Sequence, residues 1–239
     1  VQELPLRLAS PSWQHPFGLD ELGRDILARV AAGARISFIV GITVVTISAA
    51  VGTLLGAVAG YAGGALDDAI SRIIDVLMAF PGLLLAIALV AVLGPGLVNV
   101  LFALSIIGWV GYARLVRGQF LSLRQQDYVS AAQVAGAPGG YIIRKHMLPN
   151  SLTPIIVAIT FGIPTAIFTE AALSFVGVGI RPPQASWGQM VAEGSKPGYI
   201  QTDPHMLLFP VLAIGLTMLG FSFLGDGLRD ALDPKGNRD

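Results

Sequence analysis

The chain has 239 residues, of which 54% are hydrophobic and 13% are charged, and its mean hydropathy is +0.70. A soluble domain usually carries about 25% charged residues, so this composition is typical of a protein whose surface largely faces lipid. The net charge of zero argues against a nucleic-acid-binding surface, and the absence of cysteine excludes disulfides and thiolate metal sites.

Residues 1–35 mix polar and apolar side chains ahead of the first long apolar run. Within them, Asp20 is predicted to cap a short helix on which Leu22, Ile26 and Val30 form an apolar stripe at i, i+4 and i+8. Such a stripe fits either a helix that lies in the membrane interface or an ordinary packed amphipathic helix.

Five segments are long and apolar enough to cross a membrane, because a spanning helix needs roughly 20 mostly apolar residues. These segments are residues 36–60, 69–93, 97–118, 151–179 and 206–228. The sequence Leu93-Gly94-Pro95-Gly96 predicts a turn between the second and third segments, and Pro154 and Pro164 predict kinks in the fourth. We therefore expect an all-α membrane domain at 36–228 that contains a long loop at 119–150.

Three glycines recur every four residues in the first of these spans. Gly52, Gly56 and Gly60 share one helix face, where small residues let two helix backbones approach closely. We expect this face to pack against another helix. The pattern alone does not indicate what the bundle transports.

The distribution of charge predicts which side of the membrane each part of the chain faces. The loop at 119–150 and its margins hold one acidic residue, Asp127, against five basic ones. These are Arg114, Arg117, Arg124, Arg144 and Lys145. The positive-inside rule places this loop in the cytoplasm, so the tail at 229–239 is also cytoplasmic and residues 1–35 are extracytoplasmic. Since an exported N-terminal segment needs a span before it, we expect a sixth span upstream of Val1.

The cytoplasmic loop is predicted to contain two short helices, at 128–135 and 141–148. Gly136 and Pro138-Gly139-Gly140 end the first helix, and Pro149 stops the second. Small side chains on the first helix leave room for a partner protein to come close. A structured loop that binds no partner fits the same pattern.

This loop resembles the coupling loop of binding-protein-dependent ABC importer permeases, whose pattern is Glu-Ala-Ala, three residues, Gly, nine residues, Ile-x-Leu-Pro. The positions that match are Ala131, Ala132, Gly136, Leu148 and Pro149. The chain departs from the pattern at Ser130, where the family often has Glu, and at His146, where it often has Ile. His is common there in the branch that carries dipeptides, oligopeptides and nickel. The resemblance implies an ATPase-coupling loop that includes eight candidate residues: Tyr128, Ser130, Ala131, Ala132, Gly136, His146, Leu148 and Pro149.

Other segments resemble the C-type permease subunit of the same branch, and they occur in the same order. They are residues 15–25, 60–67, 112–118, 170–179 and 182–188. The resemblance implies a type I ABC importer transmembrane domain with six spans in the plasma (inner) membrane of a bacterium or archaeon. The implied partners are a B-type permease subunit, two cytosolic ATPase subunits and an extracytoplasmic solute-binding protein. The implied cargo is a peptide or a related small solute, nickel chelates included.

The chain carries no G-x-x-x-x-G-K-[ST] phosphate loop, so ATP hydrolysis is expected in separate subunits and this chain is not expected to be an enzyme. Its three histidines, His15, His146 and His205, lie too far apart in sequence to suggest a metal site, and we expect no cofactor. The alternative is a secondary transporter driven by an ion gradient. That class needs carboxylates near the bilayer midplane, for which Glu170 is the single candidate.

Ionisable residues inside a membrane are costly and often functional. Glu170, with Ser174 and Phe175, is therefore a candidate for the translocation path or its gate, although Glu170 also fits a purely structural bonding role. Asp75 is expected to pair with Arg72, three residues before it. Two tryptophans are expected to anchor the chain at the membrane interfaces: Trp13 and Trp187.

Overall fold

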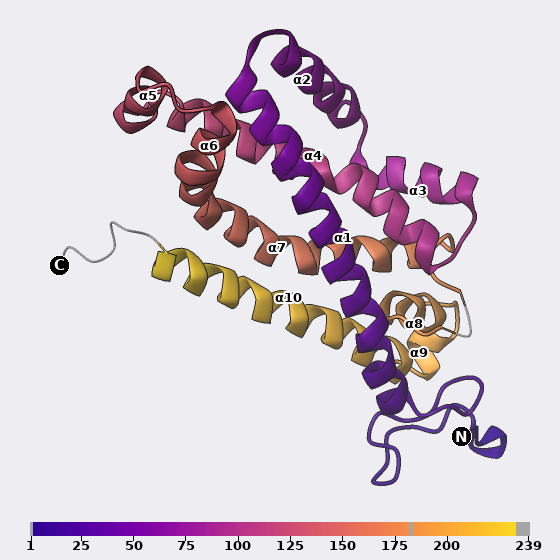
Figure 1. Cartoon of the computed structure of the whole chain (residues 1–239). Coiled ribbons are helices and arrows are strands. Elements are labelled where there is room, and N and C mark those ends of the chain that lie inside the picture. The colour runs from indigo at the N-terminus through magenta and orange to yellow at the C-terminus, as the bar shows by residue number, and fades with distance from the viewer. Residues whose placement is uncertain (1, 182–183, 233–239) are drawn as a thin grey trace. The chain divides into compact units, whose positions relative to one another are not determined.

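A computed structural model describes residues 2–181 and 184–232, so the prolines at 182–183 and the tail at 233–239 lie outside the described residues. Within these ranges every named element is a helix, loops connect the helices, and the β structure consists of two isolated bridges (Figure 1). Four helices are long and apolar enough to cross a membrane. They are α1 (Ile26–Ala62), α4 (Leu97–Leu123), the helix Gly139–Phe175 that includes α7 (Leu148–Phe175), and α10 (His205–Leu232). The helices α2 (Gly64–Met78) and α3 (Gly82–Leu93) form a bent pair, and the number of spans rises to five if this pair is counted as one span.

The helix α1 begins at Ile26, well before the predicted start of the first span. The side chain of Asp25 caps it, because its Oδ1 atom accepts the backbone N–H of Ala28 at 2.9 Å. The predicted short helix capped by Asp20 is therefore wrong. Asp20 instead folds the preceding turn, where its Oδ1 accepts the N–H groups of Leu22 and Arg24 at 2.8 and 2.9 Å.

The predicted second span is not one straight helix. It consists of α2 and α3, which are bent by 85° at the break between them. Pro81 lies in this break, and its ring disfavours a helical conformation for Phe80 while its nitrogen cannot donate a hydrogen bond. The apolar run continues through the break, so hydropathy alone does not reveal the bend.

The described chain forms two compact units, each with its own core. The first contains Val1–Thr43, Ala86–Leu104 and Ile163–Phe221, and the second contains Val44–Leu85, Ser105–Gly162 and Ser222–Asp239. Buried residues of the first core include Ile26, Ile167, Trp187, Met190 and Met206. Those of the second include Val116, Phe120, Val129, Ile142 and Met147.

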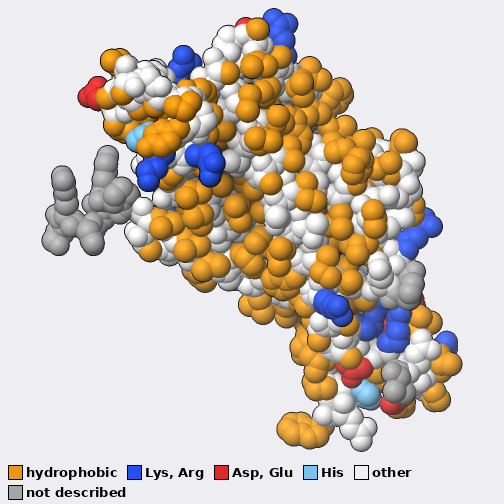
Figure 2. Space-filling view, viewed as in Figure 1, with side chains coloured by type: hydrophobic (Ala, Val, Ile, Leu, Met, Phe, Trp, Pro, Cys, Tyr) orange, Lys and Arg blue, Asp and Glu red, His pale blue; other side chains and the backbone are white. Residues whose placement is uncertain are grey.

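Hydrophobic side chains also cover much of the outer surface of the long helices (Figure 2). Only 11% of the apolar window of α10 is buried inside the chain. Its exposed apolar residues include Leu212, Leu216, Leu219 and Phe223. A surface of this kind is stable against lipid tails or against another apolar helix.

A partly buried ion-pair network joins the N-terminal segment to α8 (Trp187–Gly194) in the first unit. The Nη1 atom of Arg29 lies 2.7 Å from both Asp20 Oδ2 and Glu193 Oε2, and Arg24 Nε lies 2.6 Å from the same Asp20 oxygen. Asp20 and Arg29 are buried, whereas Arg24 and Glu193 are partly exposed, so removing Asp20 would take one of its two partners from a buried charge, Arg29.

The two tryptophans that were expected at the membrane interfaces differ in their exposure. Trp187 is buried, and its Nε1–H donates to the carbonyl oxygen of Val30 at 2.8 Å, so the predicted anchor role is wrong for this residue. Trp13 is fully exposed. Trp187 instead fixes the start of α8 against α1.

A second ion pair of the first unit gives a test by pH. The Nζ atom of Lys196 lies 2.9 and 3.1 Å from the carboxylate oxygens of Glu21, and this hydrogen bond lowers the pKa of Glu21. A group whose pKa is lower in the folded state stabilises the fold above its unfolded pKa of about 4.3, and this contribution is lost as the pH falls through the folded pKa. Because the pair is partly exposed, its contribution is under about 1 kcal/mol. Glu21→Gln is therefore expected to flatten the acid-side fall in melting temperature, measured in detergent between about pH 3 and 6.

A second variant tests the same pair from the other side. Lys196→Met removes the partner of Glu21 and should flatten the acid-side fall in melting temperature in the same way. An unchanged profile in both variants would show that the pair does not couple folding to protons.

In the second unit, α1 packs closely against α4 along the glycine face. A Cβ atom built on Gly52 would lie 2.5 Å from the carbonyl oxygen of Trp109, and one built on Gly60 would lie 2.6 Å from Phe120 Cβ. A Cβ atom on Gly56 would collide with the carbonyl oxygen of Ala113. The backbones of the two helices therefore approach as closely as glycine allows.

Gly56→Ala is expected to lower the melting temperature of the detergent-solubilised subunit, because the added methyl group forces α1 and α4 apart at a cost of about 1–3 kcal/mol. Gly111→Ala on α4 is the control, since no atom lies within 4 Å of a Cβ built there. Equal melting temperatures for the two variants would contradict the close packing at Gly56.

Acidic residues of α2 pair with basic residues of α4 in the second unit. Arg117 holds the carboxylate of Asp67 through two nitrogens, of which Nη2 lies 2.8 Å from Oδ2. Asp75 lies 3.8 Å from Arg114, so the predicted pair with Arg72 is wrong. The partner comes from a distant part of the sequence, which spacing along one helix does not reveal.

Candidate coupling site and the adjoining pocket

The short helix α5 (Asp127–Val134) is the centre of the predicted coupling loop, and one face of it is anchored in the second core. Val129 is fully buried there together with Phe120 and Met147. Ala132 packs against the same cluster. The inner face of α5 is therefore packed against the second core. A loop that moved independently of the helices would lack such packing.

The end of α5 has the geometry of a Schellman motif. Gly136 adopts φ of 76°, and the N–H of Ala137 donates to the carbonyl oxygen of Ala132 at 3.0 Å. Glycine favours this left-handed conformation because it has no Cβ atom. Apart from its chain neighbours, no atom of the described part of the chain lies within 4 Å of a Cβ built on Gly136, so the glycine faces open space.

The outer face of α5 is exposed and carries small or apolar side chains. Ser130, Ala131 and Gly136 are exposed, and Val134 is 89% exposed although it is apolar. We call the surface formed by Ser130, Ala131, Val134 and Gly136 the docking face. It has the features of a surface that another protein covers, because small residues permit close approach and an exposed valine gains from burial.

Three rings brace the base of the loop. The ring of His146 lies 6.1 Å from that of Tyr128 and 5.7 Å from that of Tyr141, measured between centroids. Tyr61 of α1 also contacts the loop, since a Cβ atom on Gly139 would lie 2.8 Å from its hydroxyl oxygen. The sequence-based site included Tyr128 and His146 but missed Tyr61 and Tyr141.

Pro149 does not stop the second helix as predicted. The helical course continues from α6 (Gly139–Ile142) through a π-helical turn, η2 (Ile143–Met147), into α7. Proline cannot donate to the carbonyl group four residues before it, and its ring crowds that carbonyl. The wider π turn just before Pro149 relieves this conflict, as π-bulges do inside α-helices. Leu148 and Pro149 therefore belong to the first turn of α7.

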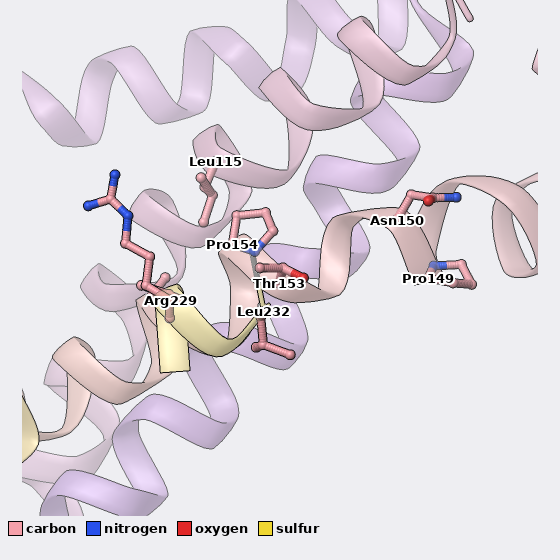
Figure 3. A pocket seen from close by; sticks show the side chains of 9 residues that line it. Leu115, Pro149, Asn150, Thr153, Pro154, Arg229 and Leu232 are labelled. Carbon is pink, nitrogen blue, oxygen red and sulfur yellow. The ribbon is translucent and has the colours of Figure 1, made fainter. Parts of the chain in front are cut away.

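A pocket of about 650 Å³ opens beside this first turn of α7 (Figure 3). Its lining includes Pro149, Asn150 and Thr153 of α7, together with Leu115, Arg229 and Leu232. Arg229 and Leu232 belong to the last turns of α10, and all of these residues lie in the second unit. Two residues at the end of the coupling motif, Pro149 and Asn150, thus also form a pocket wall.

Glu170 lies fully buried on α7 and is held by two serines. Its Oε1 atom accepts the hydroxyl groups of Ser174 at 2.7 Å and of Ser186 at 2.8 Å. Ser186 is the N-cap of α8, where its Oγ accepts the N–H of Gln189 at 3.1 Å. The Oε2 atom of Glu170 has no hydrogen-bond partner among the described residues. Glu170 therefore ties the start of α8 to α7.

The structure does not bring the three candidate gate residues together. Glu170 and Ser174 are buried and hydrogen-bonded, whereas Phe175 is 58% exposed. Sequence reasoning missed Ser186, which lies sixteen residues after Glu170 and completes the hydrogen-bonded group. The geometry favours the bonding role for Glu170 over a role in lining an open path.

The chain is similar to known membrane transport proteins over most of its length. The family of binding-protein-dependent transport system inner membrane components matches residues 52–238. The chain belongs to this family. The permease is 49% identical over 229 residues to the dipeptide transport system permease protein DppC of Alkalihalophilus pseudofirmus, covering 96% of this chain and 75% of that protein. It is 52% identical over 225 residues to the glutathione transport system permease protein GsiD of Shigella dysenteriae, covering 94% and 74%.

Solved structures show the same fold. The permease matches a chain of the MetNI methionine ABC transporter, solved in inward-facing conformations, with a TM-score of 0.65 and 22% identity. The match covers 87% of the permease and 95% of that chain. An amino acid ABC transporter crystallised with histidines gives a TM-score of 0.63 at 16% identity, with the same coverage of both chains. The permease is thus a multi-pass membrane protein with the type I ABC importer transmembrane fold, and no comparison supports a secondary transporter.

Proposed function

We propose that this permease forms half of the path through which an ATP-driven importer carries peptides or related small solutes. The single observation that carries the proposal is the docking face: it lies on a helix packed against the bundle, and its exposed Ala131 and Gly136 match the coupling pattern. The names of the relatives support the solute class, since they transport dipeptides, oligopeptides and glutathione. Nickel chelates remain within the same proposed class.

The proposed partners are a B-type permease, two cytosolic ATPase subunits and an extracytoplasmic solute-binding protein. The family description itself names a binding protein and the inner membrane. The exposed apolar face of α10 supports contact with lipid or with the second permease. The basic loop at 119–150 supports a cytoplasmic position for the docking face.

The proposed mechanism transmits force from the ATPase to the membrane helices. Closure of the ATPase pair on ATP displaces α5, and the rings of Tyr128, His146 and Tyr141 connect α5 to the π-helical turn before α7. Because the helix runs without a break from Gly139 to Phe175, a displacement at its cytoplasmic end moves α7 as well. The protein thereby alternates between inward-open and outward-open states.

Uptake assays on the complete transporter test the proposal. Labelled dipeptides, tripeptides and glutathione are offered to cells that contain the permease with its partner subunits and binding protein. Uptake is expected to continue after the proton gradient is collapsed and to stop when ATP is depleted. Loss of uptake when the proton gradient is collapsed but ATP is still present would favour an ion-driven transporter and overturn the proposal.

A further inference from the structure

We propose that the pocket between the first turns of α7 and the end of α10 binds the carboxylate of the solute as it leaves toward the cytoplasm. This inference rests on the proposed function above. The pocket has a volume of about 650 Å³, within the range of about 300–1,000 Å³ that small-molecule sites occupy. Apolar side chains form much of its wall, and its lining also includes the polar residues Asn150, Thr153 and Arg229 (Figure 3).

The charge of the pocket selects an anionic ligand. Arg229 is an exposed residue of the pocket lining, and no hydrogen bond or ion pair joins its guanidinium group to residues 2–181 or 184–232. The acidic neighbours on α10, Asp226 and Asp230, do not line the pocket. An arginine fork matches a carboxylate in two parallel hydrogen bonds, which suits the end of a peptide.

A free hydroxyl group lies in the same pocket. On α7, Ser151 and Thr160 each donate a hydrogen bond to the carbonyl oxygen four residues before them, at 2.9 and 3.0 Å. Thr153 also lines the pocket, but it makes no such bond in the described chain. Its hydroxyl can therefore bind a solute, and with Arg229 it supplies the few placed polar groups that give an apolar site its orientation.

The pocket is mechanically connected to the docking face. Pro149 and Asn150 form part of its wall, and Asn150 Nδ2 donates to the carbonyl oxygen of His146 at 2.5 Å. His146 contacts Tyr128 of α5, so a displacement of α5 changes the pocket wall. The pocket consequently holds the carboxylate in one state of the transport cycle and releases it in another.

Single cysteines test the pocket without knowledge of the solute, because the native chain contains none. Val157→Cys places a thiol in the pocket, and Leu152→Cys places one on an exposed part of the same helix outside it. The probes are two methanethiosulfonate reagents, one carrying an ethylsulfonate anion and one an ethyltrimethylammonium cation. Both variants are studied in the complete transporter, with cysteine-free partner subunits, in nanodiscs.

The anionic reagent is expected to react with Val157→Cys faster, relative to the cationic one, than it does with Leu152→Cys. Arg229→Gln should lower this ratio about threefold at low salt and leave the ratio at Leu152→Cys unchanged, because one nearby charge acts oppositely on the two reagents. Modification of Val157→Cys should also block peptide uptake, whereas modification of Leu152→Cys should not.

Three outcomes would overturn the inference. The ratio could be unaffected by Arg229→Gln, modified Val157→Cys could still transport, or neither reagent could react until lipid is stripped away. The last result would assign the pocket to the phosphate of a lipid headgroup. Uptake by unmodified Leu152→Cys, which lies outside the pocket, is measured in parallel with the proton gradient collapsed and separates these outcomes from a failure of the proposed function.

Discussion

Gly136→Asp is expected to abolish ATP-driven uptake while the subunit still inserts into the membrane. The left-handed backbone at Gly136 tolerates Asp better than most residues, so the strain within the chain is only about 1 kcal/mol. Among the described residues outside its chain neighbours, nothing lies within 4 Å of the new Cβ atom, so the side chain has open space there. Its bulk and charge fall instead on the docking face, where a closely fitted ATPase cannot accommodate them.

Two measurements check this prediction: uptake by cells, and recovery of the ATPase subunits with the purified permease. Gly64→Asp is a matched control, since Gly64 also has a positive φ of 56° and open surroundings but is the first residue of α2, outside the docking face. The control should transport and retain the ATPase. Normal uptake by Gly136→Asp would remove the main support for the coupling role.

Glu170→Ala is expected to destabilise the permease strongly. The substitution leaves the hydroxyl groups of Ser174 and Ser186 without their acceptor inside the protein, and it empties the space of the carboxyl group. Unsatisfied buried groups cost about 1–3 kcal/mol each, so we expect a loss of about 2–5 kcal/mol and a clearly lower melting temperature in detergent. The start of α8 should detach from α7, which proteolysis after residue 186 would detect.

Glu170→Gln separates the bonding role from a charge-dependent gate. The amide oxygen of Gln still accepts from both serines, and its NH₂ group takes the place of the unpartnered Oε2. If Glu170 acts through its hydrogen bonds, this variant keeps melting temperature and uptake near those of the wild type. A folded Glu170→Gln permease that no longer transports would show that the negative charge itself is required.

The helical membrane fold could be predicted from the sequence because lipid imposes long apolar runs. The turn at Gly94-Pro95-Gly96 predicted where α4 starts, since consecutive glycine and proline residues strongly favour a turn. The effects of Pro81 and Pro149 could not be predicted in the same way. One proline lies at a sharp bend and the other inside a helix that a π-helical turn accommodates, and this difference depends on the surrounding packing.

The candidate site was predictable where residues lie close in sequence, and was missed where distant segments meet. The spacing of α5 and Gly136 follows local rules of helix formation and capping. The contact of Tyr61 with Gly139, the bond from Ser186 to Glu170 and the pairing of Asp75 with Arg114 each join separate helices. Apolar periodicity shows that a helix packs but does not identify its neighbour, so these contacts needed the tertiary structure.

One helical course runs from Gly139 in the coupling loop to Phe175. At about 1.5 Å per residue, its 37 residues extend for roughly 55 Å, which exceeds the hydrocarbon thickness of a bilayer, about 30 Å. Glu170 lies in the last two turns of this helix, where its hydrogen bonds to Ser174 and Ser186 fasten the start of α8 to the end of the helix opposite Gly139.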